Sequence, residues 1–121
     1  MARTVLIVDD SASIRQMVAF TLQQAGFAVL VGCNGEDALQ KLENQRVELI
    51  ITDLNMPVMD GIAFISQLRR RPATRYTPVL MLTTESQMEK KQQGKAVGAT
   101  GWIVKPFHPG KLLDVIAKVL P

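Results

Sequence analysis

The sequence has little of what stabilises small secreted domains or anchors a chain in a membrane. It contains one cysteine in 121 residues, so no internal disulfide can form. No apolar stretch approaches the roughly 20 residues that a membrane-spanning helix needs. The N-terminus, MARTVLIVDD, lacks the longer apolar core and the small-residue cleavage site of a signal peptide. We therefore expect a cytoplasmic protein, in a reducing compartment, with no membrane partner.

Charge of one sign and aromatic side chains are also scarce. The formal net charge is +3, and aromatic residues make up 5% of the chain. Two short basic runs, RRRPATR (69–75) and EKKQQGK (89–95), hold most of the excess charge. Neither run is interleaved with stacking aromatics, so we expect no nucleic-acid partner. Both runs are interpreted as solvated surface, with a protein-binding face as the alternative for the second.

Hydrophobic residues are abundant, at 47% of the chain. This composition and length predict one globular domain with a substantial core. No linker or low-complexity tract divides the sequence. We expect residues 1–121 to form a single domain without an output domain, and we expect a monomer.

Strand-like and helix-like segments alternate along the chain. The expected strands are 4–8, 27–31, 49–52, 78–83 and 101–104, and the expected helices begin after Ser11 or Ser13, after Asn34, near Gly61, near Ser86 and near Pro109. The helix at 86–97 has the weakest apolar face, because Gly94 interrupts it and only Met88 and Val97 anchor it clearly. Five (βα) repeats predict an α/β fold: a doubly wound, parallel five-stranded sheet between two helical layers, a three-layer sandwich. The near-continuous apolar strands agree with burial on both faces of the sheet.

Polar residues follow four of the five expected strands. In open α/β sheets, ligands bind beyond the carboxyl ends of the strands. Taken singly, each residue has an ordinary interpretation as a helix cap, a turn residue, a strand former or a surface charge. Together they place three acids, two hydroxyls and an ammonium at one edge: Asp9, Asp10, Asp53, Thr83, Thr84 and Lys105.

Three acids at one edge need compensating positive charge. Two carboxylates about 4 Å apart repel by about 4 kcal/mol at an effective dielectric of 20. One lysine offsets part of this, and an all-oxygen ligand set suits Mg²⁺. Such a site is typical of phosphoryl transfer, in which a carboxylate can itself be the nucleophile and form an acyl phosphate. Asp53 ends a buried strand, and the pattern indicates that it is the acceptor.

Four motifs carry a more specific resemblance: LIVDD, TDLNMPVMDG, LTT and VKPF. In this order, and along the whole chain, the sequence resembles the receiver domain of two-component response regulators. It is similar in particular to the single-domain, CheY-like regulators of chemotaxis. The resemblance implies a flavodoxin-like sheet with the strand order 2-1-3-4-5.

The resemblance also implies how the acids act. Asp53 would accept a phosphoryl group from a phosphohistidine on a sensor histidine kinase, of the CheA-like kind in chemotaxis, and become 4-aspartylphosphate. Asp10, Asp53 and the backbone carbonyl of Asn55 would ligate Mg²⁺. Asp9 would act mainly through a water molecule bound to the metal.

The family further implies a switch. Lys105 would pair with the phosphoryl oxygens, and the bond from Lys105 to Pro106 would be cis. Thr83 would move to hydrogen-bond the phosphate, and the aromatic residue of the last strand, Trp102, would turn inward. The altered surface of the fourth helix, fifth strand and fifth helix would then bind a partner, such as a flagellar motor switch protein or a phosphatase.

Three positions are expected to tune the lifetime of the phosphorylated state: Asn55, Thr84 and Glu85. Two of the departures from the usual family pattern concern the switch and the lifetime. Trp102 stands where Tyr or Phe is usual, and Thr84 stands where Ala or Gly is commonest. The bulk of Trp102 puts the inward turn in question, and the extra atoms of Thr84 would slow access to the acyl phosphate.

Two alternatives share this site. The first is a phosphate sink, or a single-domain regulator outside motility. The second is a Mg²⁺-dependent phosphatase with an Asp nucleophile. Such phosphatases carry a second Asp two residues after the nucleophile, where this chain has Asn55, and the sequence has no insertion that would cover a substrate.

Overall fold

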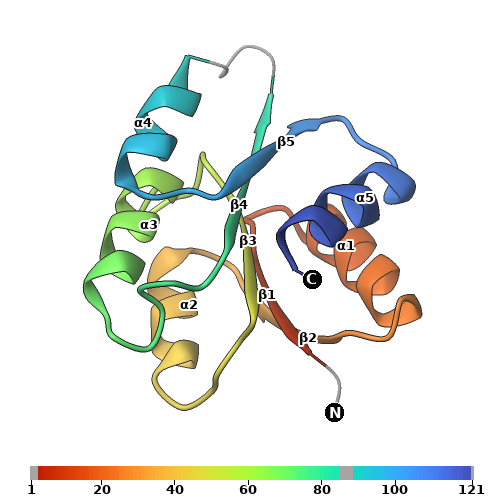
Figure 1. Ribbon diagram of the computed structural model, residues 1–121, viewed down its shortest axis with the longest axis horizontal. Helices are drawn as coiled ribbons and strands as arrows, with labels where there is room; N and C mark the ends of the chain where they lie inside the picture. Colours follow the sequence, from red (N-terminus) through yellow and green to blue (C-terminus); the bar gives the residue numbers. More distant parts are fainter. Residues whose placement is uncertain (1–2, 85–88, 121) are drawn as a thin grey trace.

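The computed structural model describes residues 3–84 and 89–120 of the chain, and shows five strands alternating with five helices (Figure 1). The strands are β1 (Thr4–Val8), β2 (Ala28–Gly32), β3 (Leu49–Asp53), β4 (Val79–Thr84) and β5 (Gly101–Lys105). The helices are α1 (Ala12–Gln24), α2 (Gly35–Leu42), α3 (Gly61–Arg70), α4 (Lys90–Val97) and α5 (Pro109–Val119).

The sheet is parallel throughout and has the order β2-β1-β3-β4-β5. The predicted fold class and strand order are therefore confirmed. In register, Val8 lies opposite Thr52, and Asp53 lies opposite Leu82. The carboxyl ends of β1, β3 and β4 thus meet at one edge, which brings the residues that follow these strands together.

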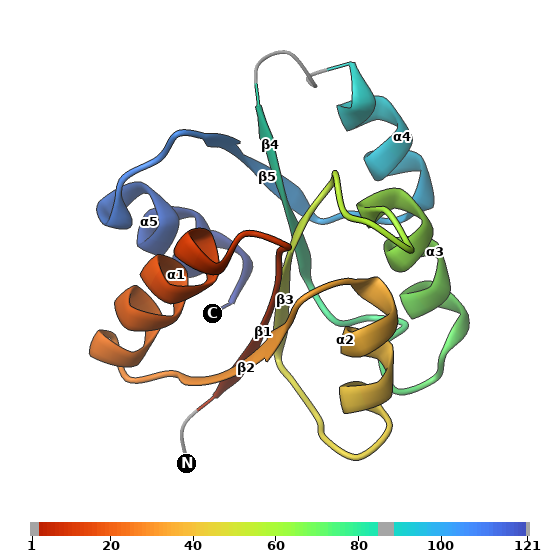
Figure 2. The same ribbon diagram turned by 180° about the vertical axis from the view of Figure 1, so that it is seen from behind.

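Helices cover both faces of the sheet. Figures 1 and 2 show α1 and α5 together on one side, and α2, α3 and α4 on the other. Each side has its own core: Val18, Leu22, Leu112 and Ile116 pack against one face of the strands. The opposite core includes Leu39, Phe64, Ile65 and Leu68. The three inner strands, β1, β3 and β4, are buried almost throughout, as their continuous apolar sequences predicted, whereas the edge strands β2 and β5 are only partly buried.

Side-chain caps fix where four helices begin. Ser11 is the cap of α1, because its hydroxyl accepts a hydrogen bond from the Ile14 N–H at 3.3 Å. Asn34, Asp60 and His108 cap α2, α3 and α5 in the same way. For His108 the acceptor is Nδ1, at 3.2 Å from the Lys111 nitrogen.

The observed ends of the elements differ slightly from the predicted ones. The strands β2 to β5 each extend one residue further at the carboxyl end, so that Asp53 and Lys105 belong to strands. Helix α4 is described from Lys90 onward, and the expected anchor Met88 lies outside the described residues. None of the helices within 3–84 and 89–120 has the length and apolar character to cross a membrane.

Candidate functional site

Three carboxylates meet at the carboxyl edge of the sheet. Asp9 and Asp10 follow β1, and Asp53 ends β3. Each residue offers one oxygen, and these oxygens all lie within 4.8 Å of one another. Asp9 and Asp53 are buried, whereas Asp10 is exposed. The acids that the sequence placed at one edge are therefore close enough to share a single cation.

Lys105 supplies the positive charge beside the buried acids. Its Nζ lies 3.2 Å from Asp9 Oδ2 and 3.3 Å from Asp53 Oδ1. One ammonium group therefore bridges the carboxylate that follows β1 and the carboxylate that ends β3. The peptide bond that follows, between Lys105 and Pro106, is cis.

The turn after β1 orients Asp9. Its Oδ1 accepts a hydrogen bond from the Ser11 N–H at 2.8 Å, and its backbone carbonyl accepts one from Arg15 Nη1 at 2.6 Å. The same short segment thus begins α1 and fixes an acid of the site. The sequence predicted Ser11 only as a possible helix cap, and it did not single out Arg15, although both residues lie close to Asp9 in the chain.

The backbone after β3 fixes Asp53. Its Oδ1 accepts a hydrogen bond from the Leu54 N–H at 2.8 Å, and the Leu54 carbonyl accepts one from the Gly61 N–H at 2.8 Å. A side chain at residue 61 would collide with the Asp53 carbonyl and would lie 2.9 Å from the Leu54 Cα. Glycine at this position lets α3 start directly against the acceptor strand.

The environment of Asp53 favours its protonated form in the absence of metal. Burial raises the pKa of the Asp53 carboxyl, and the nearby charge of Asp9 raises that pKa further. Lys105 and the Leu54 N–H act in the opposite direction and only partly offset the shift. A cation shared by the carboxylates would remove this penalty, because it favours the ionised form.

The donor set fits a hard divalent ion. All three ligand candidates are carboxylate oxygens, and Mg²⁺ binds through a few carboxylates while keeping several waters. One acid of the cluster is solvent-exposed, which leaves room for those waters. The acidic cluster is therefore consistent with a magnesium site of the receiver type.

The structure places the other predicted residues around these acids. Thr83 is buried near the end of β4, and its hydroxyl donates to the Thr84 carbonyl at 3.2 Å. Thr84 lies opposite Lys105 in the sheet. Asn55 is exposed, two residues beyond Asp53. Glu85, expected to tune the lifetime, lies outside the described residues.

Trp102 lies on β5, and it is partly exposed to solvent. The residue is 37% exposed, and Lys91 Nζ of α4 sits 3.9 Å from the centre of its ring. A cation at this distance over an indole ring is held by a cation–π interaction. The residue predicted to act in the switch is thus paired with the helix beside it.

Two features of this edge were not found from the sequence. An apolar cavity of about 360 Å³ lies beside Lys105 and is lined by Ile14, Met17 and Phe107 among others. Val58, in the loop after β3, has a positive φ of 73° and is exposed. No local sequence signal marks a β-branched residue for this backbone conformation, which usually favours glycine or asparagine.

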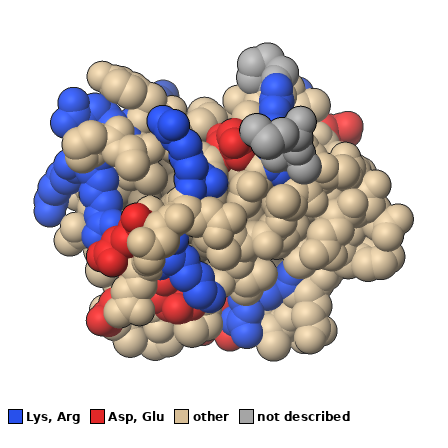
Figure 3. Space-filling model, turned by 90° about the horizontal axis from the view of Figure 1, so that it is seen from below, with Lys and Arg blue, Asp and Glu red and all other residues tan. Residues whose placement is uncertain are grey.

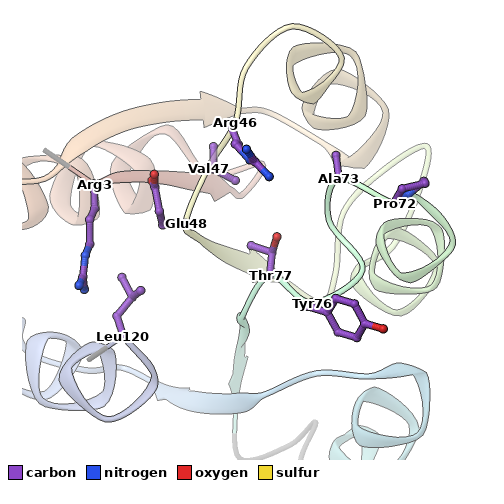
Figure 4. A pocket seen from close by; sticks show the side chains of 9 residues that line it. All are labelled: Arg3, Arg46, Val47, Glu48, Pro72, Ala73, Tyr76, Thr77 and Leu120. Carbon is purple, nitrogen blue, oxygen red and sulfur yellow. The ribbon is translucent and has the colours of Figure 1, made fainter. Parts of the chain in front are cut away.

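A second cavity, of about 470 Å³, opens at the opposite end of the sheet (Figure 4). It is lined by Arg3, Arg46, Glu48, Tyr76, Leu120 and neighbouring residues. Figure 3 views the molecule from this end and shows Lys and Arg side chains mainly on one side, with acids among them. The acidic cluster and Lys105 are at the other edge, so this cavity is separate from the site.

A doubly wound α/β domain with a cluster of acids and a lysine at the carboxyl edge of its sheet has the architecture of a receiver-type signalling domain. Residues 5–117 match the family described as the response regulator receiver domain. The chain belongs to this family, and it is a signalling protein rather than a conventional enzyme.

Similar proteins include both short and long members of the family. The chemotaxis response regulator CheY4 of Vibrio cholerae is 53% identical, with a TM-score of 0.94, and the match covers 99% of this chain and 100% of that one. The phosphate regulon regulator PhoB of Escherichia coli is 39% identical over 120 residues, which are 99% of this chain and 52% of PhoB. PhoP of Bacillus subtilis, an alkaline phosphatase synthesis regulator, is 36% identical. The chain spans about half the length of these curated relatives.

Proposed function

We propose that the protein receives a phosphoryl group on Asp53 from a sensor histidine kinase, and that it acts as a stand-alone regulator in the cytoplasm. The observation that carries this proposal is the contact of Lys105 Nζ with both Asp53 Oδ1 and Asp9 Oδ2, at 3.3 and 3.2 Å. It gives a nucleophilic carboxylate a neighbouring cation that can also pair with an incoming phosphoryl oxygen. The match to CheY4 along its whole length supports a single-domain arrangement.

The transfer breaks one bond to phosphorus and forms another. An Asp53 Oδ attacks the phosphorus of a phosphohistidine, the new O–P bond forms, and the N–P bond to the imidazole breaks. The leaving imidazole nitrogen keeps the bonding electron pair and takes up a proton from solvent. Asp53 must be ionised to attack, so the groups that favour its ionised form also favour the reaction.

The neighbouring residues would hold the reacting groups. Asp10, Asp53 and the Asn55 carbonyl would hold Mg²⁺, with Asp9 contributing through a bound water, and the ion would supply charge neutralisation at the phosphoryl oxygens. Lys105 would pair with one of those oxygens after transfer. Its contacts with both carboxylates support this role, because they keep the ammonium group beside Asp53.

Phosphorylation would add roughly 1.5 to 2 negative charges and three acceptor oxygens at Asp53. The Thr83 hydroxyl, which now donates to a backbone carbonyl, would turn to the phosphoryl group. Trp102 would then leave its place beside Lys91 and change the surface of α4, β5 and α5. Asn55, Thr84 and Glu85 would set how quickly water removes the phosphoryl group.

We propose chemotaxis or motility as the pathway, on the basis of the similarity to CheY4. The partners would be a kinase of the chemotaxis kind, and either a flagellar motor switch protein or a phosphatase. A phosphate sink, or a single-domain regulator outside motility, is the alternative that shares the same site. A phosphatase acting on other molecules is disfavoured, because Asn55 replaces the expected general acid and the site has no covering insertion.

The proposal is tested with the purified chain, Mg²⁺ and acetyl phosphate. Intact mass should show one phosphoryl adduct, and the adduct should disappear in Asp53→Asn or when EDTA removes the metal. Asp60→Asn is the matched control. Asp60 is another acid of the loop after β3, and it caps α3. Asparagine is an equally good helix cap, so this substitution should preserve the fold. An adduct that persists in Asp53→Asn, or one lost equally in Asp60→Asn, would contradict the assignment of the acceptor.

A further inference from the structure

Val58 combines an unfavourable backbone conformation with an exposed apolar side chain. Its φ is 73°, and the Met59 N–H donates to the Pro57 carbonyl at 2.8 Å, which closes a three-residue turn around it. Turns of this kind with a positive central φ are rare and strained. For a β-branched residue this backbone conformation is a genuine outlier.

The fold does not require valine at this position. The residue is 74% exposed, so its side chain has little packing that would offset the strain. Asparagine or glycine would adopt the same φ at lower cost. The neighbouring Met59 is half-buried and packs against the core that includes Phe64 and Leu68, so the turn is anchored without Val58.

The position of Val58 relates it to the acceptor. The residue lies five positions after Asp53, in the loop that connects β3 to α3. The bond from the Gly61 N–H to the Leu54 carbonyl ties the two ends of this loop together beside the acid. Val58 therefore belongs to the connection that leaves the carboxyl edge of the sheet directly after Asp53.

Apolar surface flanks the acids on both sides of the sheet. The cavity lined by Ile14, Met17 and Phe107 is on the side of α1 and α5. Val58 lies in the connection between β3 and α3, and α3 covers the other face of the sheet (Figures 1 and 2). A protein that brings a phosphohistidine onto Asp53 must cover the space between these two surfaces.

We propose that Val58 is a docking contact for the protein that donates the phosphoryl group to Asp53. This inference rests on the proposed function. The side chain contributes apolar contact to the donor protein and takes no part in the chemistry of transfer. The strain in the free protein is then the consequence of keeping an apolar residue in a turn that suits glycine or asparagine.

Two donors separate docking from chemistry. Acetyl phosphate needs only the acidic site, whereas a phosphorylated sensor-kinase histidine domain that phosphorylates the wild-type chain must also dock. Val58→Asn should lower kcat/KM for the protein donor about tenfold, mainly through KM, which corresponds to about 1.4 kcal/mol. The rate with acetyl phosphate should stay within about twofold, and Tm should rise because the turn is relaxed.

Val58→Ile is the matched variant, because it keeps both the apolar surface and the backbone penalty. It should retain the wild-type kcat/KM with both donors. Equal rates for wild type and Val58→Asn with the protein donor would overturn the inference, as would equal losses with the two donors. A wild-type chain that acetyl phosphate and Mg²⁺ leave unmodified would instead overturn the proposed function, and this inference with it.

Discussion

At the carboxyl end of the sheet, Asp53 is a buried acid beside another acid. At the amino end, the guanidinium of Arg69 is also partly buried but is surrounded by backbone carbonyls. Its Nε and Nη2 donate to the Gly98 carbonyl at 3.1 and 2.8 Å. Its Nη1 donates to the carbonyls of Thr74 and Thr77 at 2.8 and 2.7 Å. These bonds join the end of α3, the chain before β4 and the turn before β5.

Burial disfavours the charged forms of both Arg69 and Asp53, but the groups around the two side chains compensate their charges to different degrees. It lowers the pKa of Arg69, which still stays protonated because an arginine begins far above neutral pH. It raises the pKa of Asp53, and only Lys105 and one N–H oppose the shift. The charge of Arg69 is thus compensated by carbonyls of the fold, whereas the charge of Asp53 is compensated only in part.

The largest expected effect on stability is at the amino end. Arg69→Met should lower the free energy of unfolding by about 2–4 kcal/mol, because it leaves several carbonyls without their donor. Urea unfolding followed by circular dichroism measures the change. Arg70→Met is the control: Arg70 is exposed and donates one bond, to Ser66 Oγ at 3.2 Å, so its removal should change stability by at most about 0.5 kcal/mol. Similar losses in the two variants would remove the contrast.

At the carboxyl end of the sheet, removal of a buried charge should instead stabilise the fold. The pKa of Asp53 is raised by folding, so its contribution to stability is complete below the unfolded pKa of about 3.9 and is lost as pH rises through the folded value. Asp53→Asn should therefore match the wild-type Tm near pH 4 and exceed it by several degrees near pH 7. Thermal unfolding between these pH values, without Mg²⁺, measures the difference.

Magnesium should narrow that difference. The ion binds the ionised wild-type cluster more tightly than the variant, and so stabilises the wild type by mass action. Adding Mg²⁺ at pH 7 should raise the wild-type Tm clearly and the Asp53→Asn Tm much less. If Asp53→Asn has a lower Tm than wild type at pH 7 without metal, the buried carboxylate does not destabilise the folded protein.

Much of this contrast could be predicted from the sequence, and the reasons are local. Asp9, Asp53 and Lys105 follow or end apolar strands, and parallel strands deliver their ends to one edge. The sequence indicated that Arg69 belongs to a solvated basic run. Its partners are backbone carbonyls of the segments 74–77 and 98, and every residue has a carbonyl, so the sequence does not indicate which carbonyls will accept hydrogen bonds from it. The positive φ of Val58 could not be predicted for a related reason, because the closure of the whole loop sets the backbone conformation at this residue.

The smallest expected effect concerns α4, whose end is fixed at Gly98 by Arg69 and whose first turn carries Lys91. Only Gly94 of this helix is fully buried, where an added Cβ would collide with Met81. The contact of Lys91 with Trp102 therefore matters more than it would beside a well-packed helix. Lys91→Met should cost about 0.5–1 kcal/mol and shift the Trp102 emission.

Trp102 is the only tryptophan, so the tryptophan emission reports on the surroundings of this one ring. Lys95→Met is the control, since Lys95 is exposed on the same helix, and it should leave the emission unchanged. With Mg²⁺ and acetyl phosphate, the wild-type emission should move as the ring leaves Lys91, and the Lys91→Met emission should move less. An emission that responds equally in both proteins would show that Lys91 does not hold the ring, and would leave the acceptor role of Asp53 untouched.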